Sequence, residues 1–250
     1  MSQNRKKKKG CKLSVEESFT ESILNLDKTR IRQIIQANVG ICRRKGVYPL
    51  IILMHTGEAN FHSYGRLKEV FEVGDILINE GKADVNAIRG DSPRNTAVSI
   101  AAVLGSYGKL NFLLERGADV HSSRWKITSE GYPLFLVIRW SHVDLVNMVL
   151  RHGADPNAKD QDSGNSTLYY AISIMDSHRK ERLYICNILI EMGAKVNQQC
   201  FYFDKRLRKN VRGSALCYAL SAACADKELI LLLKQMGAQR RIVEWPVVCI

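Results

Sequence analysis

The sequence lacks the patterns that mark membrane proteins, secreted proteins and zinc ribbons. No window approaches the roughly 18 consecutive apolar residues that a membrane span requires, and no apolar stretch follows the charged first residues, as it would in a secretory signal. The 7 cysteines are scattered, and none lie in a Cys-x-x-Cys pair. We therefore expect reduced, mostly buried thiols and no transmembrane segment. The expected location is the cytoplasm or nucleus, or a host cell if the source is a host-associated microbe.

Apolar residues and positive charge, in contrast, are plentiful. Hydrophobic residues make up 46% of the 250 residues, which excludes an intrinsically disordered chain. The formal net charge is +12, but residues 1–12 contribute +6 and residues 204–212 contribute +4, so the rest of the chain carries only +2. The basic character therefore belongs to two short segments, and the overall charge is weak evidence about what the folded body binds.

A repeated pattern organises the chain. Four helix-like apolar runs end in Gly-Ala, and a fifth ends in Gly81-Lys82-Ala83; the aligned alanines are 35, 36, 40 and 44 residues apart. Upstream lies a second shared element, for example Thr96-Ala97-Val98 or Tyr132-Pro133-Leu134, in both cases 21 residues before the closing glycine. Each unit predicts a short buried helix, a polar break, and an amphipathic helix closed by a left-handed glycine. Because one helix pair cannot bury both faces alone, the units are expected to stack into a solenoid.

These residues resemble the ankyrin repeat family, whose unit reads Gly-x-Thr-Pro-Leu-His-x-Ala-Ala, then Gly-His, Leu-Leu and Gly-Ala-Asp-Val-Asn. The best matches are residues 96–121 and 132–157, and the resemblance covers about residues 46–240. It implies an all-α helix-turn-helix solenoid of about five repeats with long finger loops and a degenerate N-terminal capping unit. The expected boundaries are a basic tail at 1–12, a helical cap at 13–45, an array at 46–240 and a C-terminal tail at 241–250. Within the array we place repeats at about 46–87, 88–122, 123–158, 159–198 and 199–240.

The sequence departs from the family pattern at the start of every first helix. The residues that replace the family's histidine are Ile51, Ser99, Phe135, Tyr169 and Cys217. We therefore expect most of the side-chain hydrogen bonds that rigidify this turn to be missing, and an irregular array less stable than a consensus one.

No catalytic, cofactor or metal motif is apparent. There is no Gly-rich phosphate loop and no Gly-x-Ser-x-Gly. His55 and His62 are interpreted as solvated loop histidines, and Cys200, Cys217 and Cys224 as buried small residues. We predict no enzyme and no cofactor; an irregular site in the insertions stays open as a third hypothesis that no motif supports.

The resemblance implies a protein-binding surface made by the fingers and the exposed face of each first helix. Carried over by position, its residues are Arg44, Lys45, His55, Arg89, Arg94, Trp125, Lys126, Arg139 and Trp140. Trp140 with Arg139 is the strongest candidate because Trp and Arg dominate many binding interfaces. The alternative is a Trp140 ring that packs on its own loop.

The leading hypothesis is a monomeric, non-enzymatic scaffold that binds a protein with acidic and apolar surface groups. The alternative is binding of nucleic acid or anionic membrane through the two basic segments. Its candidate residues are Arg5, Lys6, Lys7, Lys8 and Lys9, and Lys205, Arg206, Arg208, Lys209 and Arg212. The plainer interpretations are a solvated tail or import signal, and a finger whose Phe201-Tyr202-Phe203 run packs on its neighbours.

Overall fold

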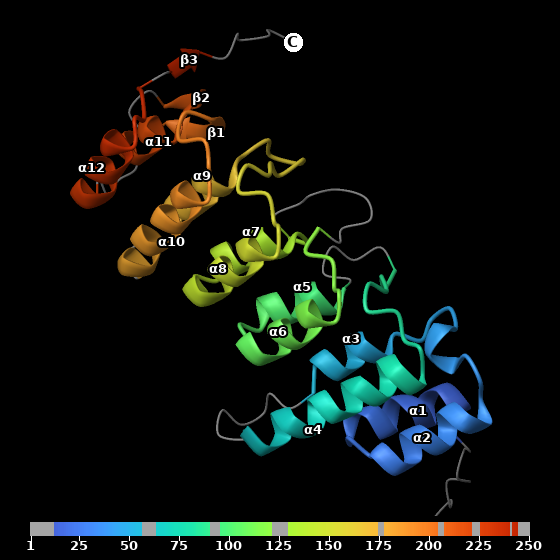
Figure 1. Ribbon diagram of the computed structural model, residues 1–250. Helices are drawn as coiled ribbons and strands as arrows, with labels where there is room; N and C mark the ends of the chain where they lie inside the picture. Colours follow the sequence, from blue (N-terminus) through green and yellow to red (C-terminus); the bar gives the residue numbers. More distant parts are fainter. Residues whose placement is uncertain are drawn as a thin grey trace, which may run out of the picture. The chain divides into compact units, whose positions relative to one another are not determined.

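A computed structural model (Figure 1) describes residues 13–56, 64–90, 96–121, 130–174, 178–204, 208–221, 226–240 and 242–244. It divides into two compact units, the first ending at Asp84 and the second beginning at Val85. Within the described residues, no helix is both long and apolar enough to cross a membrane.

The first unit consists of helices packed around a small core. Its elements are α1 (Val15–Leu24), α2 (Lys28–Ala37), the 3-10 turn η1 (Ile41–Arg43), α3 (Pro49–Met54), α4 (Tyr64–Asp75) and the π-helical turn η2 (Ile76–Glu80). Ser14 begins α1 with a capping box, because its hydroxyl accepts from the Glu17 N–H while the Glu17 carboxylate accepts from the Ser14 N–H. The sequence of the N-terminal cap predicts an apolar stripe of Ile23, Leu24, Ile31, Ile34 and Ile35, and of these Ile23 and Ile31 are fully buried.

Two details of the first unit differ from the sequence pattern. Leu24, which shares the helical spacing of the stripe, is 52% exposed because α1 ends there. Gly81 has an ordinary negative φ of −77° rather than a left-handed one, since the π-helical turn ends the helix instead. It is glycine for lack of space: a Cβ there would lie 2.5 Å from the Cys42 Sγ and 2.8 Å from the Leu77 carbonyl oxygen.

The second unit is a stack of four helix pairs. They are α5 (Ala97–Val103) with α6 (Tyr107–Glu115), α7 (Pro133–Arg139) with α8 (Val143–Arg151), α9 (Thr167–Ile172) with α10 (Arg179–Glu191), and α11 (Ala215–Ser221) with α12 (Lys227–Gln235). The first helices α5, α7, α9 and α11 contact one another in order, and so do the second helices α6, α8, α10 and α12 (Figure 1). The stacking buries a continuous core between pairs, as a helical repeat requires.

The predicted closing glycines have the backbone conformation that ends a helix. Gly117, Gly153, Gly193 and Gly237 all have φ between 79° and 95°. The prediction of left-handed glycines is therefore confirmed at these four positions. Each glycine lies one residue beyond the cap of a second helix and turns the chain toward the next unit.

The expectation that side-chain bonds are mostly missing at the first helices is wrong for three of the four pairs in this unit. The Thr96, Ser166 and Ser214 hydroxyls accept from the N–H of Ser99, Tyr169 and Cys217. A hydroxyl performs the capping, so the family's histidine is not needed for it. Only Tyr132 begins its helix without a side-chain cap, and there Pro133 presets the first turn.

The expected all-α architecture is corrected by a small sheet, with two strands between α10 and α11 and a third after α12. Strands β1 (Gln199–Asp204), β2 (Lys209–Ser214) and β3 (Ile242–Glu244) form it in the order β1-β2-β3, and both pairings are antiparallel. The segment was expected to be a long finger loop. It forms strands because its residues alternate: Cys200, Tyr202 and Val211 are buried and pack with Cys217, while Phe203 and Arg212 are exposed.

Asparagine side chains connect consecutive pairs of the second unit. Asn157 donates from Nδ2 to the Gly193 carbonyl oxygen at 3.0 Å, and its Oδ1 accepts from the Lys195 N–H at 2.8 Å. The equivalent contacts join Asn86 to Gly117 and Asp119, and Asn197 to Gly237 and Gln239.

The fourth such position is occupied by His121. There the Tyr132 hydroxyl lies 3.2 Å from the His121 Nδ1 and accepts from the Asp155 N–H at 3.3 Å. Burial raises the pKa of Tyr132 to about 12, so the hydroxyl stays protonated. One aromatic side chain therefore replaces the asparagine bridge at this junction.

Candidate partner-binding surface

The surface at the end of α7 begins where burial stops. Pro133 to Ile138 are buried, and the next two residues, Arg139 and Trp140, are exposed. Trp140 is the C-terminal cap of α7 and leaves 50% of its surface exposed. Among the described residues, its indole packs on no other aromatic ring and Arg139 forms no ion pair with a carboxylate. Both side chains are thus available to a partner.

The turn after Trp140 is held by packing against the preceding repeat. Ser141 has φ of 58°, and His142 then lies against Gly105, where a Cβ would approach the imidazole ring to 2.5 Å. Burial lowers the pKa of His142, and a hydrogen bond with the Val103 backbone offsets part of this effect. The neutral imidazole therefore acts as a packing element that fixes the direction in which Arg139 and Trp140 project.

The equivalent ends of the neighbouring first helices are different in chemistry. α5 ends at the half-exposed Val103 and is capped by Leu104, while α9 is capped by the exposed Ser173. Because α7 contacts both α5 and α9, the Trp140 corner lies between an apolar and a hydroxyl-bearing neighbour in the stack.

Of the remaining predicted partner-binding residues, four are described and three are not. Arg44, Lys45 and His55 are exposed in the first unit, and Arg44 forms an ion pair with Glu16 at 3.1 Å. Arg89 is exposed in the second unit. Arg94, Trp125 and Lys126 lie outside the described residues.

The residues predicted for polyanion binding are also split. Arg208, Lys209 and Arg212 are exposed on the β1–β2 hairpin. Tyr202 packs inward and Phe201 is half-buried, as the packing interpretation expects, but Phe203 is 57% exposed. The residues outside the described part of the chain are Arg5, Lys6, Lys7, Lys8, Lys9, Lys205 and Arg206.

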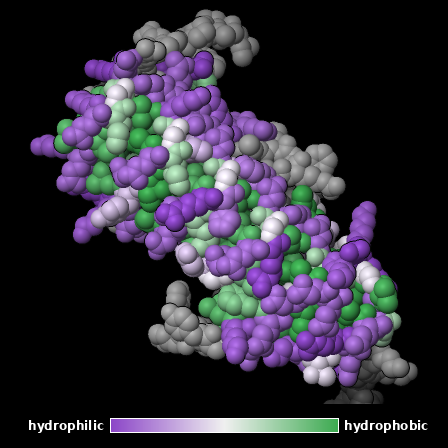
Figure 2. Space-filling model, in the orientation of Figure 1, coloured by the Kyte–Doolittle hydropathy of each residue, from purple (hydrophilic) through white to green (hydrophobic). Residues whose placement is uncertain are grey.

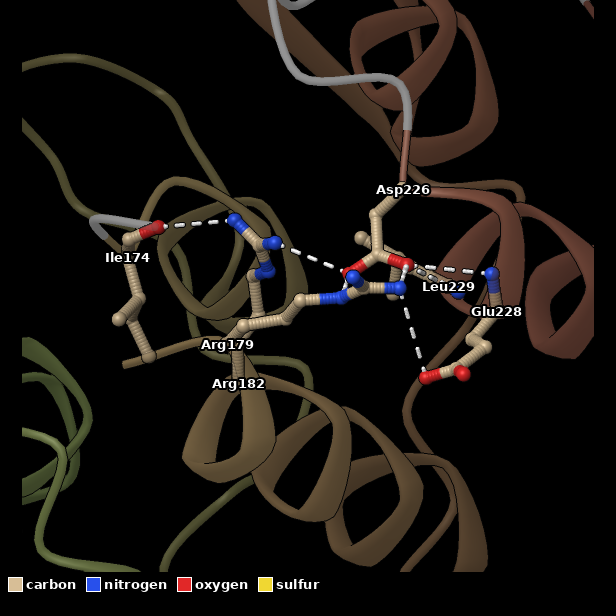
Figure 3. Close-up of polar contacts among 6 residues, drawn as sticks. All are labelled: Ile174, Arg179, Arg182, Asp226, Glu228 and Leu229. Carbon is tan, nitrogen blue, oxygen red and sulfur yellow. Dashed lines mark hydrogen bonds and ion pairs between the residues drawn. The ribbon is translucent and has the colours of Figure 1, made fainter. Parts of the chain in front are cut away.

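An ion-pair cluster that the sequence pattern did not indicate joins the last two repeats (Figure 3). Asp226 accepts from the Arg179 Nε and one of its Nη atoms, both at 2.9 Å, and from the Arg182 Nη2 at 3.0 Å. It also caps α12 by accepting from the Glu228 and Leu229 N–H groups. The Arg182 and Asp226 side chains are 3% and 2% exposed, so the pair is buried.

A row of aromatic rings follows the first helices of the second unit. Ring centroids are 5.0 Å apart for Phe135 and Tyr170, 4.6 Å for Tyr169 and Tyr218, and 5.2 Å for Tyr202 and Tyr218. Phe135 and Tyr169 occupy the positions of the family's histidine, so aromatic packing stands where a polar side chain was expected.

The described residues contain no group of three His, Cys, Asp or Glu side chains that could hold a metal ion. Of the cysteines, Cys42, Cys186, Cys200 and Cys217 are buried and form no disulfide. Burial raises the pKa of Cys42 to about 11, and that of Cys186 and Cys200 to about 12.

An open cavity of about 680 Å³ is lined by the residues from Gly193 to Gln198 together with Lys159, Ile190 and Met236. None of the predicted site residues that the structure describes lines it.

The visible face of the molecule in Figure 2 is largely hydrophilic, with separate hydrophobic patches between the polar side chains. The exposed large apolar residues are likewise spread over several elements, among them Tyr107 on α6, Tyr184 on α10 and Leu231 on α12. Single exposed apolar residues are common on proteins, so Trp140 stands out by its neighbour Arg139 and its place at a helix end rather than by exposure alone.

One segment of the second unit matches a known family model. The ankyrin repeat model matches residues 132–161, which span α7, α8 and the turn that follows them. Ankyrin repeats generally mediate protein–protein interactions. Residues 132–161 therefore match an ankyrin repeat, in agreement with the resemblance seen in the sequence.

Proposed function

We propose that the chain is a non-enzymatic interaction module that binds another protein at the exposed end of α7, with Trp140 and Arg139 as its central contacts. The observation that carries the proposal is the half-exposed Trp140 beside the exposed Arg139. The turn behind them is fixed by His142 packed on Gly105. A rigid corner loses little conformational entropy on binding, which favours affinity.

The contribution of Trp140 follows from its exposed area. A tryptophan side chain buries about 150–250 Å² when covered, and half of that surface is still available at Trp140. Covering about 100 Å² of apolar surface stabilises a complex by about 2–3 kcal/mol. Such a residue qualifies as a binding hot spot, and the Arg139 guanidinium supplies an adjacent group for an acidic side chain.

The proposed partner presents an apolar side chain next to a carboxylate. Arg89 in the second unit is proposed as a further basic contact, and Arg94, Trp125 and Lys126, which lie outside the described residues, as further contacts. In the first unit, Arg44, Lys45 and His55 are proposed as basic contacts. Arg44 contributes least in this proposal, because its ion pair with Glu16 already satisfies part of its charge.

Affinity capture from cell extract with the full-length chain tests the proposal. We expect a partner whose recovery falls with Trp140→Ala, through a loss of roughly 30- to 100-fold in affinity, and also falls with Arg139→Ala. Tyr107→Ala is the matched control, because Tyr107 is a comparably exposed aromatic residue on a second helix. If every captured protein is recovered equally by all four chains, the α7 corner is not the binding site.

A further inference from the structure

The β1–β2 hairpin has two faces of opposite chemistry. The register pairs Phe201 with Arg212 and Phe203 with Asn210, so these four side chains belong to the outer face. Tyr202 pairs with Val211 on the other face, which is buried. Alternation along both strands therefore separates an aromatic and basic surface from an apolar one.

The inner face anchors the hairpin firmly. Cys200, Tyr202, Val211 and Cys217 form a buried cluster, and Tyr169 and Tyr218 pack against it. On the other side of β2, β3 adds a third strand. The outer face is thus displayed on a supported sheet rather than on a loose loop, which reduces the entropy lost when a ligand binds.

Two phenyl rings and a guanidinium lie together on the outer face. Phe203 is 57% exposed, and no ring contact among the described residues covers it. Phe201 is half-buried against Gly164, where a Cβ would lie 3.1 Å from the ring. The Arg212 guanidinium carbon lies 5.4 Å from the centroid of the Phe201 ring, a cation–π distance that holds the arginine on this face.

The acidic residue of the hairpin is buried, and its basic residues are exposed. Asp204, its one acidic residue, is buried at 4% exposure. Arg208, Lys209 and Arg212 are exposed. In the described part of the chain, neither Arg208 nor Arg212 takes part in a salt bridge. Asp204 is paired with Lys209 in the register of the face that carries Tyr202 and Val211. The outer face therefore presents the exposed Phe203 ring and the Arg212 cation, with Arg208 exposed just before β2.

We propose that the outer face of the β1–β2 hairpin binds single-stranded nucleic acid. A base stacks on the exposed Phe203 ring, and Arg208 and Arg212 contact the flanking phosphates. Every base offers a π-face and every nucleotide a negative charge, so this combination of ring and cations matches a single strand without a need for sequence readout. An acidic peptide would have to present an aromatic side chain beside its carboxylates, whereas each nucleotide carries both groups. The proposal goes beyond protein binding at the α7 corner and does not depend on it.

Fluorescence anisotropy of the full chain with labelled oligouridylate and oligothymidylate of about 12 nucleotides tests this proposal. We expect Phe203→Ala to weaken binding roughly five- to hundredfold, as loss of one stacked base does. Two phosphate contacts predict a slope of about −1.4 for log affinity against log salt. Arg212→Gln is expected to reduce that slope by about half.

Matched controls separate the hairpin from other sources of binding. Tyr184→Ala removes a more exposed aromatic residue on α10 and is expected to leave binding unchanged. A variant with Lys6, Lys7, Lys8 and Lys9 replaced by glutamine is expected to keep the dependence on Phe203. Circular dichroism confirms that each variant is folded.

Three results overturn the proposal. The first is no binding of either oligonucleotide at low salt. The second is binding that the tail variant abolishes and that Phe203→Ala leaves unchanged. The third is Phe203-dependent binding of polyglutamate or of anionic vesicles by a chain that does not bind the oligonucleotides. Loss of the Trp140-dependent partner in the capture experiment affects none of these readouts, so the two proposals fail independently.

Discussion

Replacing Asp226 with alanine is expected to destabilise the last two repeats more than any surface substitution. The change removes the carboxylate that the buried Arg182 faces at 3.0 Å and that Arg179 grips with two bonds. Breaking a buried pair from one side costs about 3–5 kcal/mol, because the remaining charge stays buried without its partner. Loss of the helix cap at Glu228 and Leu229 adds about 1 kcal/mol.

Two further variants divide this cost. Asp226→Asn keeps an oxygen that can cap α12 but removes the charge, so it is expected to recover only the capping part, about 1 kcal/mol. Replacing Arg182 with Met as well as Asp226 with Asn removes both buried charges. Because burying a charge pair is itself costly, this double variant is expected to be more stable than Asp226→Ala alone.

Urea denaturation followed by far-ultraviolet circular dichroism measures these differences. A loss of under about 1 kcal/mol for Asp226→Ala, the value of an exposed pair, would refute the reasoning. So would a double variant that is no more stable than Asp226→Ala. Burial by itself would raise the pKa of Asp226, but hydrogen bonds from Arg179 and Arg182 outweigh it and lower the pKa. The stabilisation is therefore complete above the carboxyl's ordinary pKa of about 3.9 and is lost as the pH falls through the lower folded value.

Three other outcomes are expected. Gly105→Ala should lower the free energy of unfolding by about 2–4 kcal/mol, because a residue with positive φ gains a Cβ against the His142 ring. The control Gly90→Ala also has a positive φ but has open space around it, and should lower the free energy of unfolding by only about 1 kcal/mol. Equal melting temperatures of the two variants would contradict this prediction. Asn157→Ala should lower the free energy of unfolding in urea by about 1–2 kcal/mol, because it removes two hydrogen bonds between repeats. The control Asn187→Ala removes only a hydrogen bond to Glu191 in the same helix and should cost less than about 0.5 kcal/mol. Because the pKa of His142 is lowered in the folded chain, the unfolded chain binds more protons below the ordinary pKa of 6.5. The melting temperature should therefore fall as the pH falls from about 7 to about 5. His142→Gln should reduce this dependence of the melting temperature on pH.

Local patterns predicted the helical repeat, and long-range pairing decided what they missed. The apolar runs and closing glycines around Gly117 and Gly153 are contained within single units, so their spacing is visible in the sequence. The strand 199–204 is defined by pairing with 209–214, which in turn pairs with 242–244, and the basic, aromatic composition of residues 199–214 resembles a loop. In the structure every second side chain of this strand is buried, among them Cys200 and Tyr202, and this alternation is the feature that marks the segment as a strand.

The ion-pair cluster was beyond sequence reasoning for a related reason. Arg182 and Asp226 are 44 residues apart, and their contact depends on how α10 and α12 align in the stack. Arg179 and Arg182 also lie in the first turn of α10, where cations are unfavourable near the helix dipole. Their placement there is explained only by the carboxylate of the next repeat.

The Tyr132 bridge between His121 and Asp155 divides the second unit into two segments that are expected to unfold separately. In a linear array, each repeat is coupled only to its neighbours, so the weakest junction sets how far unfolding spreads. The junctions at Asn157 and Asn197 share the same two-bond amide clamp, while the junction at His121 relies on one hydroxyl. The residues from Tyr132 onward therefore form a longer block that unfolds together, and the α5–α6 repeat is the part expected to exchange its amide hydrogens as a separate, faster unit.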